Sequence, residues 1–515
     1  MRGRRILVAF AAATWLARAQ AGEAFRCSAR GGAVWHEYRS RHFLLDTDVS
    51  GSKAESLVRN LETMHALVVQ ALVGGQAEIP GRVRVVAPGD AGLFRELAGS
   101  GDIGGYQKNR GGGSLMLPAI VLPATEASSE TIAHEFAHHL SWFLFPRQPA
   151  WFSEGLAGFA QTVARYDTAA VGTTGSRVVR GEPGRARYAG LVPVGFVDAL
   201  ATLQPVPPKE LLEWRGSMHD DRGRFHVWSW LLYHCLWNTR SQQFRDYRRR
   251  LSDGEDPARA WVEVFPEFDP EKPGASERLA KELQQYLQVP FHPYPVSAGA
   301  DGGFADSPLR PADVHLLLLG VRAPRPDENP DVLVRAELAE ALAEDPAQPE
   351  AVAWKAQLDG VPAVPELRKV VSARPGDWRG WLLLGEAMRG DGSAAEKEAA
   401  SRTAVTLNPE SARANHALAW QLATTGRARE ALTWANRALD LAPWDPGITD
   451  TLAAVAFSLG KCAEALALEQ RAVDLLPPGA TGEEELRKRL RGYREHCTPQ
   501  ATPPSASSSA GARAR

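Results

Sequence analysis

Residues 131–157, TIAHEFAHHLSWFLFPRQPAWFSEGLA, contain two predicted helices and a turn from which the rest of the chain can be interpreted. The first helix is predicted to begin at Ser128, because serine favours the N-cap and Glu130 follows in the first turn. It must end near Pro146, since the residue before a proline is disfavoured in a helix. Pro149 then opens a second helix, and the tight turn between the two prolines would return this helix beside the first.

The first of these helices carries an H-E-x-x-H sequence formed by His134, Glu135 and His138. Histidines four positions apart stand one turn apart on one helix face, so both imidazoles can reach one Zn²⁺ ion at about 2.0–2.1 Å. Glu135 can then act as general base toward a water whose pKa zinc lowers to about 7. The motif arises by chance in about one chain in a hundred of this length.

A catalytic zinc ion needs a third protein ligand. The metzincin pattern would place a histidine six residues after His138, but Leu144 occupies that position, which excludes this class. The second helix instead offers Glu154, 16 residues after His138. The turn between the helices would bring this carboxylate beside the two histidines.

The segments H-E-F-A-H-H (134–139) and W-F-S-E-G-L-A (151–157) together resemble the gluzincin metallopeptidases, most closely their bacterial peptidase MA-like branch. The resemblance covers about residues 33–290. It implies an α+β zincin-like metallopeptidase domain, with a small mixed sheet and a helical subdomain around the zinc site.

The resemblance also implies roles for individual residues. The zinc ligands would be His134, His138 and Glu154, and Glu135 would be the catalytic base. One position departs from the thermolysin-type pattern, in which an aspartate four residues after the ligand glutamate supports a histidine. Gly158 stands there in this chain, so that support must come from elsewhere or is weaker.

Gluzincins further supply a tyrosine or histidine, about 60–70 residues beyond the third ligand, that stabilises the oxyanion. His226 falls at this distance, where related proteins resemble Y-x-x-S/A-W, and it is the first candidate. Tyr233, seven residues further along the same predicted helix, is the second. The alternative for His226 is a partly buried helix histidine near an aromatic cluster.

The segments before the motif predict the small sheet. Residues 41–47 and 82–87 have the composition of strands, and residues 52–72 have helical apolar spacing. The glycine-rich residues 101–113 are predicted to form a loop. Residues 115–122 are predicted to form an edge strand, because proline is tolerated at sheet edges and this stretch meets two prolines. The resemblance implies that this edge binds an extended peptide.

Several conspicuous residues near the motif have structural interpretations. His139 points about 100° away from His138 around the helix, so it is expected to be structural. Five tryptophans are expected to pack the helical subdomain around the site: Trp142, Trp151, Trp228, Trp230 and Trp237.

The N-terminus has the form of a secretory signal peptide over residues 1–21. Three arginines precede the apolar stretch 6–16, and an A-x-A sequence follows. The signal predicts an exported protein, found in the periplasm, the cell envelope or outside the cell. Disulfides persist in such compartments, so Cys462 and Cys497 are candidates to pair, whereas Cys235 is expected to be a buried thiol.

A 34-residue period runs through the C-terminal third of the chain. It is marked by Pro375, Pro409, Pro443 and Pro477, by Gly392, Gly426 and Gly460, and by Gly385, Ala419 and Ala453. The pattern resembles the tetratricopeptide (TPR) repeat over residues 376–477, with a shorter, degenerate repeat at 331–375. It predicts an all-α superhelix whose concave face binds a peptide or a protein partner; the alternative is that the repeats only support the peptidase.

The 515 residues therefore divide into five predicted parts: signal peptide 1–21, gluzincin-like peptidase domain 22–295, linker 296–330, TPR-like helical repeats 331–497 and disordered tail 498–515. The formal net charge is −2, which argues against a nucleic-acid partner. Beyond the signal, no apolar run approaches the ~20 residues of a membrane-spanning helix.

The predicted function is hydrolysis of peptide bonds by a zinc-activated water, with a peptide or protein as substrate. Two alternatives stay open. One is an inactive zinc-binding scaffold whose repeat surface mediates protein–protein interaction. The other is a hydrolase that uses the same zinc site on a bond other than an amide.

Overall fold

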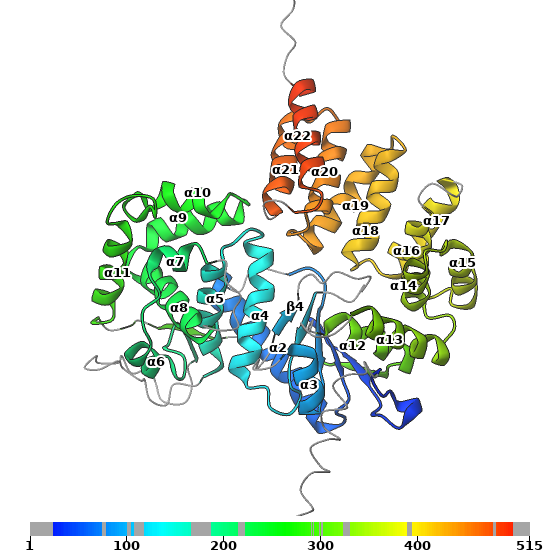
Figure 1. The fold of residues 1–515 in the computed structure, drawn as a ribbon, viewed down its shortest axis with the longest axis horizontal. Helices are drawn as coiled ribbons and strands as arrows, with labels where there is room; N and C mark the ends of the chain where they lie inside the picture. Colours follow the sequence, from blue (N-terminus) through cyan, green and yellow to red (C-terminus); the bar gives the residue numbers. More distant parts are fainter. Residues whose placement is uncertain are drawn as a thin grey trace, which may run out of the picture.

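The computed structural model describes residues 24–74, 79–99, 105–107, 118–165, 187–214, 222–289, 291, 293–297, 299, 302–322, 330–388, 394–476 and 480–497. An α+β domain with a helical subdomain occupies one side of the molecule, and an arc of helices rises from it on the other (Figure 1). The predicted signal peptide and C-terminal tail lie outside the described residues.

The α+β domain contains a six-stranded mixed sheet with the strand order β4-β5-β3-β2-β1-β8. The strands are β1 (His36–Arg39), β2 (Phe43–Thr47), β3 (Val83–Ala87), β4 (Gly105–Gln107), β5 (Ala119–Val121) and β8 (Ala305–Pro308). β3 runs parallel to β2 and β5, and the remaining pairs are antiparallel. The predicted small mixed sheet is therefore present.

Two helical layers cover the two faces of this sheet. α2 (Ser52–Val73) and α4 (Ser129–Leu144) pack on the face that carries Val85, while α3 (Ala91–Ala98) and α12 (Pro311–Val321) pack on the face that carries Val86. Consecutive residues of a strand point to opposite faces, which is why β3 supplies both layers with valine. The sheet thus provides a rigid support for α4, the helix of the H-E-x-x-H motif.

The expectation that residues 115–122 form an edge strand is wrong for the residues described. β5 is paired on both sides, with β3 and with β4. Pro118 and Pro123 flank β5 instead of interrupting it, so its backbone N–H groups remain available for the ladder. The neighbour β4 lies within residues 101–113, for which the glycine content predicts a loop, and it ends the sheet on this side.

The segment 296–330 is not a linker in the residues described. It contributes β8, which pairs with β1, and α12, which packs against both α3 and α13 (Pro330–Glu344). The Pro, Gly and Asp residues that favour a linker lie around these two elements. The sheet and the helical arc therefore share α12 and are continuous.

The helical subdomain is held together by large aromatic side chains. Its helices are α5 (Ala150–Ala160), α6 (Phe196–Thr202), α7 (Pro208–Leu212), α8 (Arg222–Thr239), α9 (Ser241–Ser252), α10 (Pro257–Val264) and α11 (Ala275–Tyr286), with the strand pair β6 (Arg187–Ala189) and β7 (Tyr294–Val296). Trp151, Trp228 and Trp230 are buried here, as expected, and Trp237 packs against the same core. The expectation is wrong for Trp142, which lies near the end of α4 and packs against a cluster of the helical arc instead.

The arc of helices is a TPR-like repeat array. Its members beyond α13 are α14 (Pro349–Asp359), α15 (Val364–Ala373), α16 (Trp378–Ala387), α17 (Ala394–Leu407), α18 (Ala412–Thr424), α19 (Ala428–Leu441), α20 (Pro446–Ser458), α21 (Cys462–Leu475) and α22 (Glu483–Cys497). Successive helices pack as pairs, as in α18 with α19 and α20 with α21. Gly426 and Gly460 have positive φ in the turns within these two pairs, which explains why glycine recurs there.

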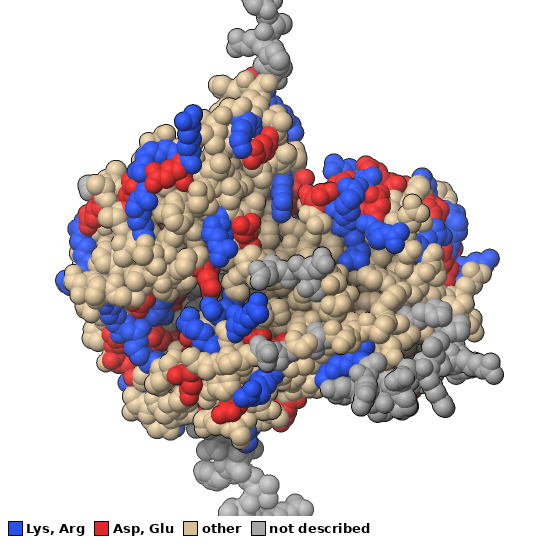
Figure 2. Space-filling view, turned by 180° about the vertical axis from the view of Figure 1, so that it is seen from behind, with Lys and Arg blue, Asp and Glu red and all other residues tan. Residues whose placement is uncertain are grey.

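The cysteine predictions are confirmed. Cys462 and Cys497 form a disulfide that ties α22 to α21, with their Cα atoms 5.6 Å apart. Cys235 is a buried thiol. On the face in Figure 2, Lys and Arg lie interspersed with Asp and Glu, in keeping with the near-zero net charge. None of the described helices is both long enough and apolar enough to cross a membrane.

Candidate metal centre

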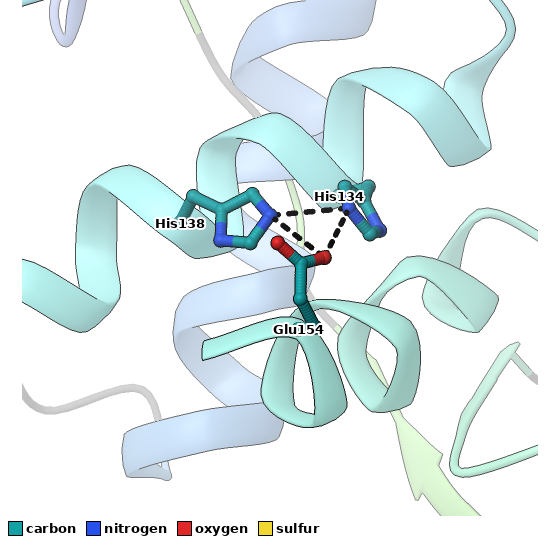
Figure 3. Close-up of side chains that lie close together, drawn as sticks. All are labelled: His134, His138 and Glu154. Carbon is teal, nitrogen blue, oxygen red and sulfur yellow. Dashed lines mark hydrogen bonds and ion pairs between the residues drawn. The ribbon is translucent and has the colours of Figure 1, made fainter. Parts of the chain in front are cut away.

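His134, His138 and Glu154 converge between two adjacent helices (Figure 3). The two histidines lie one turn apart on α4, whose N-cap Ser128 accepts a hydrogen bond from the backbone N–H of Thr131. α5 returns beside α4 and presents the Glu154 carboxylate to both rings. The Nε2 atoms of the histidines lie 3.1 Å apart, and Oε2 of Glu154 lies 3.6 Å from Nε2 of His134 and 3.5 Å from Nε2 of His138.

These separations fit the donor set of a tetrahedral zinc site. Zinc bonds of about 2.0–2.1 Å at tetrahedral angles place neighbouring ligand atoms about 3.3 Å apart. The three observed separations bracket this value. Oε2 of Glu154 is also buried. It lies farther from the Nε2 atoms of His134 and His138 than a normal hydrogen bond would place it. Two imidazoles and one carboxylate in this arrangement could hold a Zn²⁺ ion and leave one coordination position for water or substrate.

The two histidines are oriented by neutral side chains that sequence reasoning missed. Nδ1 of His134 lies 2.8 Å from Oε1 of Gln161, and Nδ1 of His138 lies 2.9 Å from Oγ of Ser153. A hydrogen bond donated by Nδ1 leaves the lone pair of Nε2 for a metal. Ser153 stands directly before Glu154, and Gln161 stands seven residues after it, which is the spacing of two helical turns.

The close approach of α5 and α8 leaves little room for a side chain at Gly158 or Gly155. A Cβ atom at Gly158 would lie 3.2 Å from Cδ1 of Trp230. At Gly155 it would lie 2.5 Å from Cβ of Tyr233 and 2.6 Å from the backbone oxygen of Ser229. α8 thus occupies the space that a longer side chain at position 158 would need, and the side chain that contacts His134 is that of Gln161.

Charge is unevenly distributed over the site. Burial lowers the pKa of His134, but the adjacent carboxylates of Glu154 and Glu135 outweigh it and raise this pKa to about 9. Burial alone would raise the pKa of Glu154, yet His138 and His226 hold it well below its ordinary value. Glu154 is therefore an anion that attracts positive charge.

Glu135 differs from Glu154 in its protonation behaviour. Burial raises the pKa of its carboxyl group, although the charges of His134 and His138 oppose the shift. The side chain is 8% exposed. A buried carboxylate with a raised pKa is suited to accept and return a proton.

The structure separates the two candidates for an oxyanion donor. Nε2 of His226, on α8, lies 3.2 Å from Oε2 of Glu154, so this histidine adjoins the ligand cluster. The ring of Tyr233 is fully buried among Phe152, Phe159 and Phe244, so the geometry favours His226, and the oxyanion role of either residue stays a prediction. Tyr233 follows His226 by seven residues, nearly two turns of α8, so the two lie close to one helix face. The aromatic ring of Tyr233 nevertheless packs into the subdomain core.

His139 adjoins a ligand in sequence but is not part of the ligand cluster. It is buried, and its ring contacts Phe143 and Trp444. Burial lowers its pKa to about 3, so the ring packs as a neutral aromatic group. The structural role expected for it agrees with this position.

No family model matches the chain, and no curated protein matches it. Among solved structures, a thermophilic TPR protein of Thermus thermophilus is 26% identical, with a TM-score of 0.27, over 32% of this chain and 90% of its own. A MamA protein is 20% identical, with a TM-score of 0.24, over 34% and 88% of the two chains. MamA from Desulfovibrio magneticus RS-1 is 18% identical, with a TM-score of 0.25, over 30% and 91%.

Proposed function

We propose that this chain is an exported zinc-dependent peptidase of gluzincin type, whose TPR-like array binds a protein partner or the substrate. The observation that carries the proposal is the convergence of His134, His138 and Glu154 at separations suited to zinc, with Glu135 beside them. Two histidines and a glutamate with one coordination position left over form the ligand set of catalytic zinc in peptidases.

Each residue of the site has a separate role in the proposed reaction. Zinc, when bound, would supply Lewis acidity toward the substrate carbonyl and the attacking water. Glu135 accepts a proton from that water and delivers it to the leaving amine nitrogen, so its raised pKa serves both transfers. His226 donates a hydrogen bond to the carbonyl oxygen as negative charge develops on it. Gln161 and Ser153 hold the imidazoles of His134 and His138 in the tautomer that binds metal.

The buried base supports an enzyme over an inactive scaffold. Burying a carboxylate such as that of Glu135 costs free energy unless it is compensated by nearby charges or hydrogen bonds. A protein that only bound zinc would keep its ligands and could replace Glu135 with an apolar residue at no loss. The inactive zinc-binding scaffold is therefore the second interpretation and becomes an outcome of the test below.

The test compares zinc content and peptide cleavage in four purified proteins: wild type, His138→Ala, Glu135→Gln and Glu130→Gln. Wild type should hold one equivalent of zinc and cleave peptides in a proteome-derived peptide library. His138→Ala should lose both properties, and Glu135→Gln should keep zinc but lose cleavage. Glu130→Gln is the matched control, because this acid lies on the same helix but pairs with Arg165 outside the site.

Three results would redirect the proposal. Zinc binding without cleavage in wild type would favour the scaffold, and cleavage that is unchanged in Glu135→Gln would refute the mechanism. A silent peptide library, together with turnover of an ester or another hydrolysable class, would favour a non-peptidase hydrolase. Absence of zinc from wild type purified under metal-replete conditions would refute the metal site itself.

Export is supported by the signal-like residues 1–21 and by the Cys462–Cys497 disulfide, since disulfides persist in oxidising compartments. Cell fractionation, with mass spectrometry of the mature N-terminus, tests this part of the proposal. Cleavage after residue 21 is expected. A chain that stays uncleaved in the cytoplasmic fraction would contradict export.

A further inference from the structure

The C-terminal end of α4 is covered by the repeat array. Trp444, in the turn between α19 and α20, is 7% exposed and meets Phe143 edge to face, with ring centroids 4.8 Å apart and planes at 89°. The same indole lies 6.4 Å from the ring of His139, which directly follows the ligand His138. The C-terminal end of the helix that carries His134 and His138 therefore meets the array at the turn between α19 and α20.

An apolar cluster joins the two halves at this point. On the array side it contains Ala438, Ala442, Trp444 and Ile448, and on the α4 side it contains Trp142 and Phe143. Most of the array residues come from the end of α19 and the start of α20. Because packed side chains have few alternative arrangements, a contact of this kind transmits small displacements instead of absorbing them.

Contacts from neighbouring repeats flank this cluster. Nη1 of Arg82 lies 2.8 Å from Oε2 of Glu410, which is 34 residues before Trp444 and so occupies the equivalent turn. Nη1 of Arg147 lies 3.6 Å from Oδ1 of Asp474, at the end of α21. A Cβ atom at Gly81 would lie 3.3 Å from Leu441. The turns between repeats thus form one edge of the array, and this edge is seated on the α+β domain.

We propose that Trp444 is a positioning residue for the metal centre and that the array acts as an outer support for α4. Through Phe143 and His139, the indole fixes the axial position and rotation of the helix that carries His134 and His138. Loss of the indole should leave both ligands in place but less well ordered, which weakens a metal site whose bonds tolerate little displacement. The zinc part of this proposal rests on the proposed function, whereas the support of α4 does not.

The experiment measures two properties of full-length Trp444→Ala. Hydrogen exchange of residues 129–144 is followed in the metal-free chain, and the zinc dissociation constant is measured by competition with a chromophoric chelator. Trp420→Ala is the matched control, because Trp420 belongs to the same array but is 39% exposed on α18. Trp444→Phe tests whether a smaller aromatic ring restores the contact.

Trp444→Ala should speed exchange in α4 and weaken zinc binding by about threefold to tenfold, less than the roughly 10- to 100-fold caused by losing a direct partner of a ligand. Trp444→Phe should recover most of both properties, and Trp420→Ala should change neither. Unchanged exchange in α4 together with unchanged zinc binding would overturn the proposal.

Exchange in α20 and α21 shows whether Trp444→Ala has unfolded the array. If it has, Phe143→Ala removes the same contact from the α4 side and leaves the array sequence intact, with the same two readouts expected to move. If wild type binds no zinc, the proposed function fails, while faster exchange in α4 alone would still support the positioning role.

Discussion

The helical subdomain around the metal centre and the TPR-like array are both built from packed helices, but they pack by different means. In the subdomain, glycine lets α5 approach α8 until a Cβ at Gly155 would meet the backbone of Ser229, and tryptophan and phenylalanine fill the remaining space. In the array, small side chains such as Ala404 and Ala438 recur every 34 residues and are fully buried. The subdomain is therefore packed around one core, whereas the array repeats the same helix–helix contact in each repeat.

This difference determines how far a disturbance spreads. Each repeat of an array contacts only its neighbours, so a local loss stays local. The subdomain shares one core with α4 and the adjoining face of the sheet, and α5 lies within it. Damage to that core should therefore reach the metal centre, whereas damage at the far end of the array should not.

The largest effect on stability that would test this comparison is expected from the double replacement of Cys462→Ser and Cys497→Ser. The disulfide closes a loop with a sequence separation of 35, and its loss should cost roughly 2–4 kcal/mol. Hydrogen exchange should accelerate in α21 and α22, which the disulfide joins, and stay unchanged in α8 and α9 of the subdomain. Faster exchange throughout the subdomain would show that the array does not behave as a chain of local units.

A matched pair of glycine substitutions compares the two kinds of packing directly. Gly155→Ala should lower the free energy of unfolding by about 1–3 kcal/mol, because backbone and Cβ atoms of α8 have to move. At Gly385 in the array, an added Cβ comes closest to the Oγ of Ser401, at 3.1 Å, and this hydroxyl can rotate. Urea unfolding of the metal-free chains measures both. If alanine at Gly155 and at Gly385 lowered the free energy of unfolding equally, the proposed difference in packing between subdomain and array would be wrong.

Within the subdomain, Gln161→Ala should separate metal binding from folding. Loss of the hydrogen bond to Nδ1 of His134 should weaken zinc binding by roughly 10- to 100-fold with little change in unfolding. Chelator competition measures the dissociation constant, and the exposed Gln284→Ala serves as control. If Gln161→Ala bound zinc as tightly as wild type, Gln161 would have no role in metal binding.

The last prediction concerns the pH dependence contributed by a buried acid at the C-terminal end of the array. Burial and the charge of Asp450 raise the pKa of Glu469 from 4.5 to about 8. Between these values the folded chain keeps a proton that the unfolded chain has lost, so the free energy of unfolding should fall as pH rises through this window. Glu469→Gln should remove this part of the pH dependence.

Thermal or urea unfolding across pH 4.5–8, monitored in α20 to α22, measures the effect, with the exposed Glu464→Gln as control. Because the array is local, the metal centre should show no corresponding change at Glu469→Gln. A pH dependence identical to that of wild type would contradict the raised pKa.

Periodic and local features of this protein were accessible from the sequence. The 34-residue spacing predicts the helix pairs because each repeat buries the same positions, and the i, i+4 histidines predict their shared face because helix geometry is local. The disulfide partners could be proposed because the chain has only four cysteines, and Glu154 because it lies on the helix that returns beside the two histidines. Pro118 and Pro123 misled the assignment of β5, since a composition rule does not state whether proline lies inside a strand or beside it.

Other features depend on contacts between segments that are distant in the chain. The sequence by itself determined the helices, the repeat period and the candidate donor set for a metal, because each follows from spacing along one element or two adjacent ones. Tertiary structure alone decided that β8 joins the sheet, that Tyr233 is buried, that Gln161 supports His134 and that Trp444 reaches α4. The physical reason is that packing between elements depends on the shape of the whole core, which no local pattern specifies.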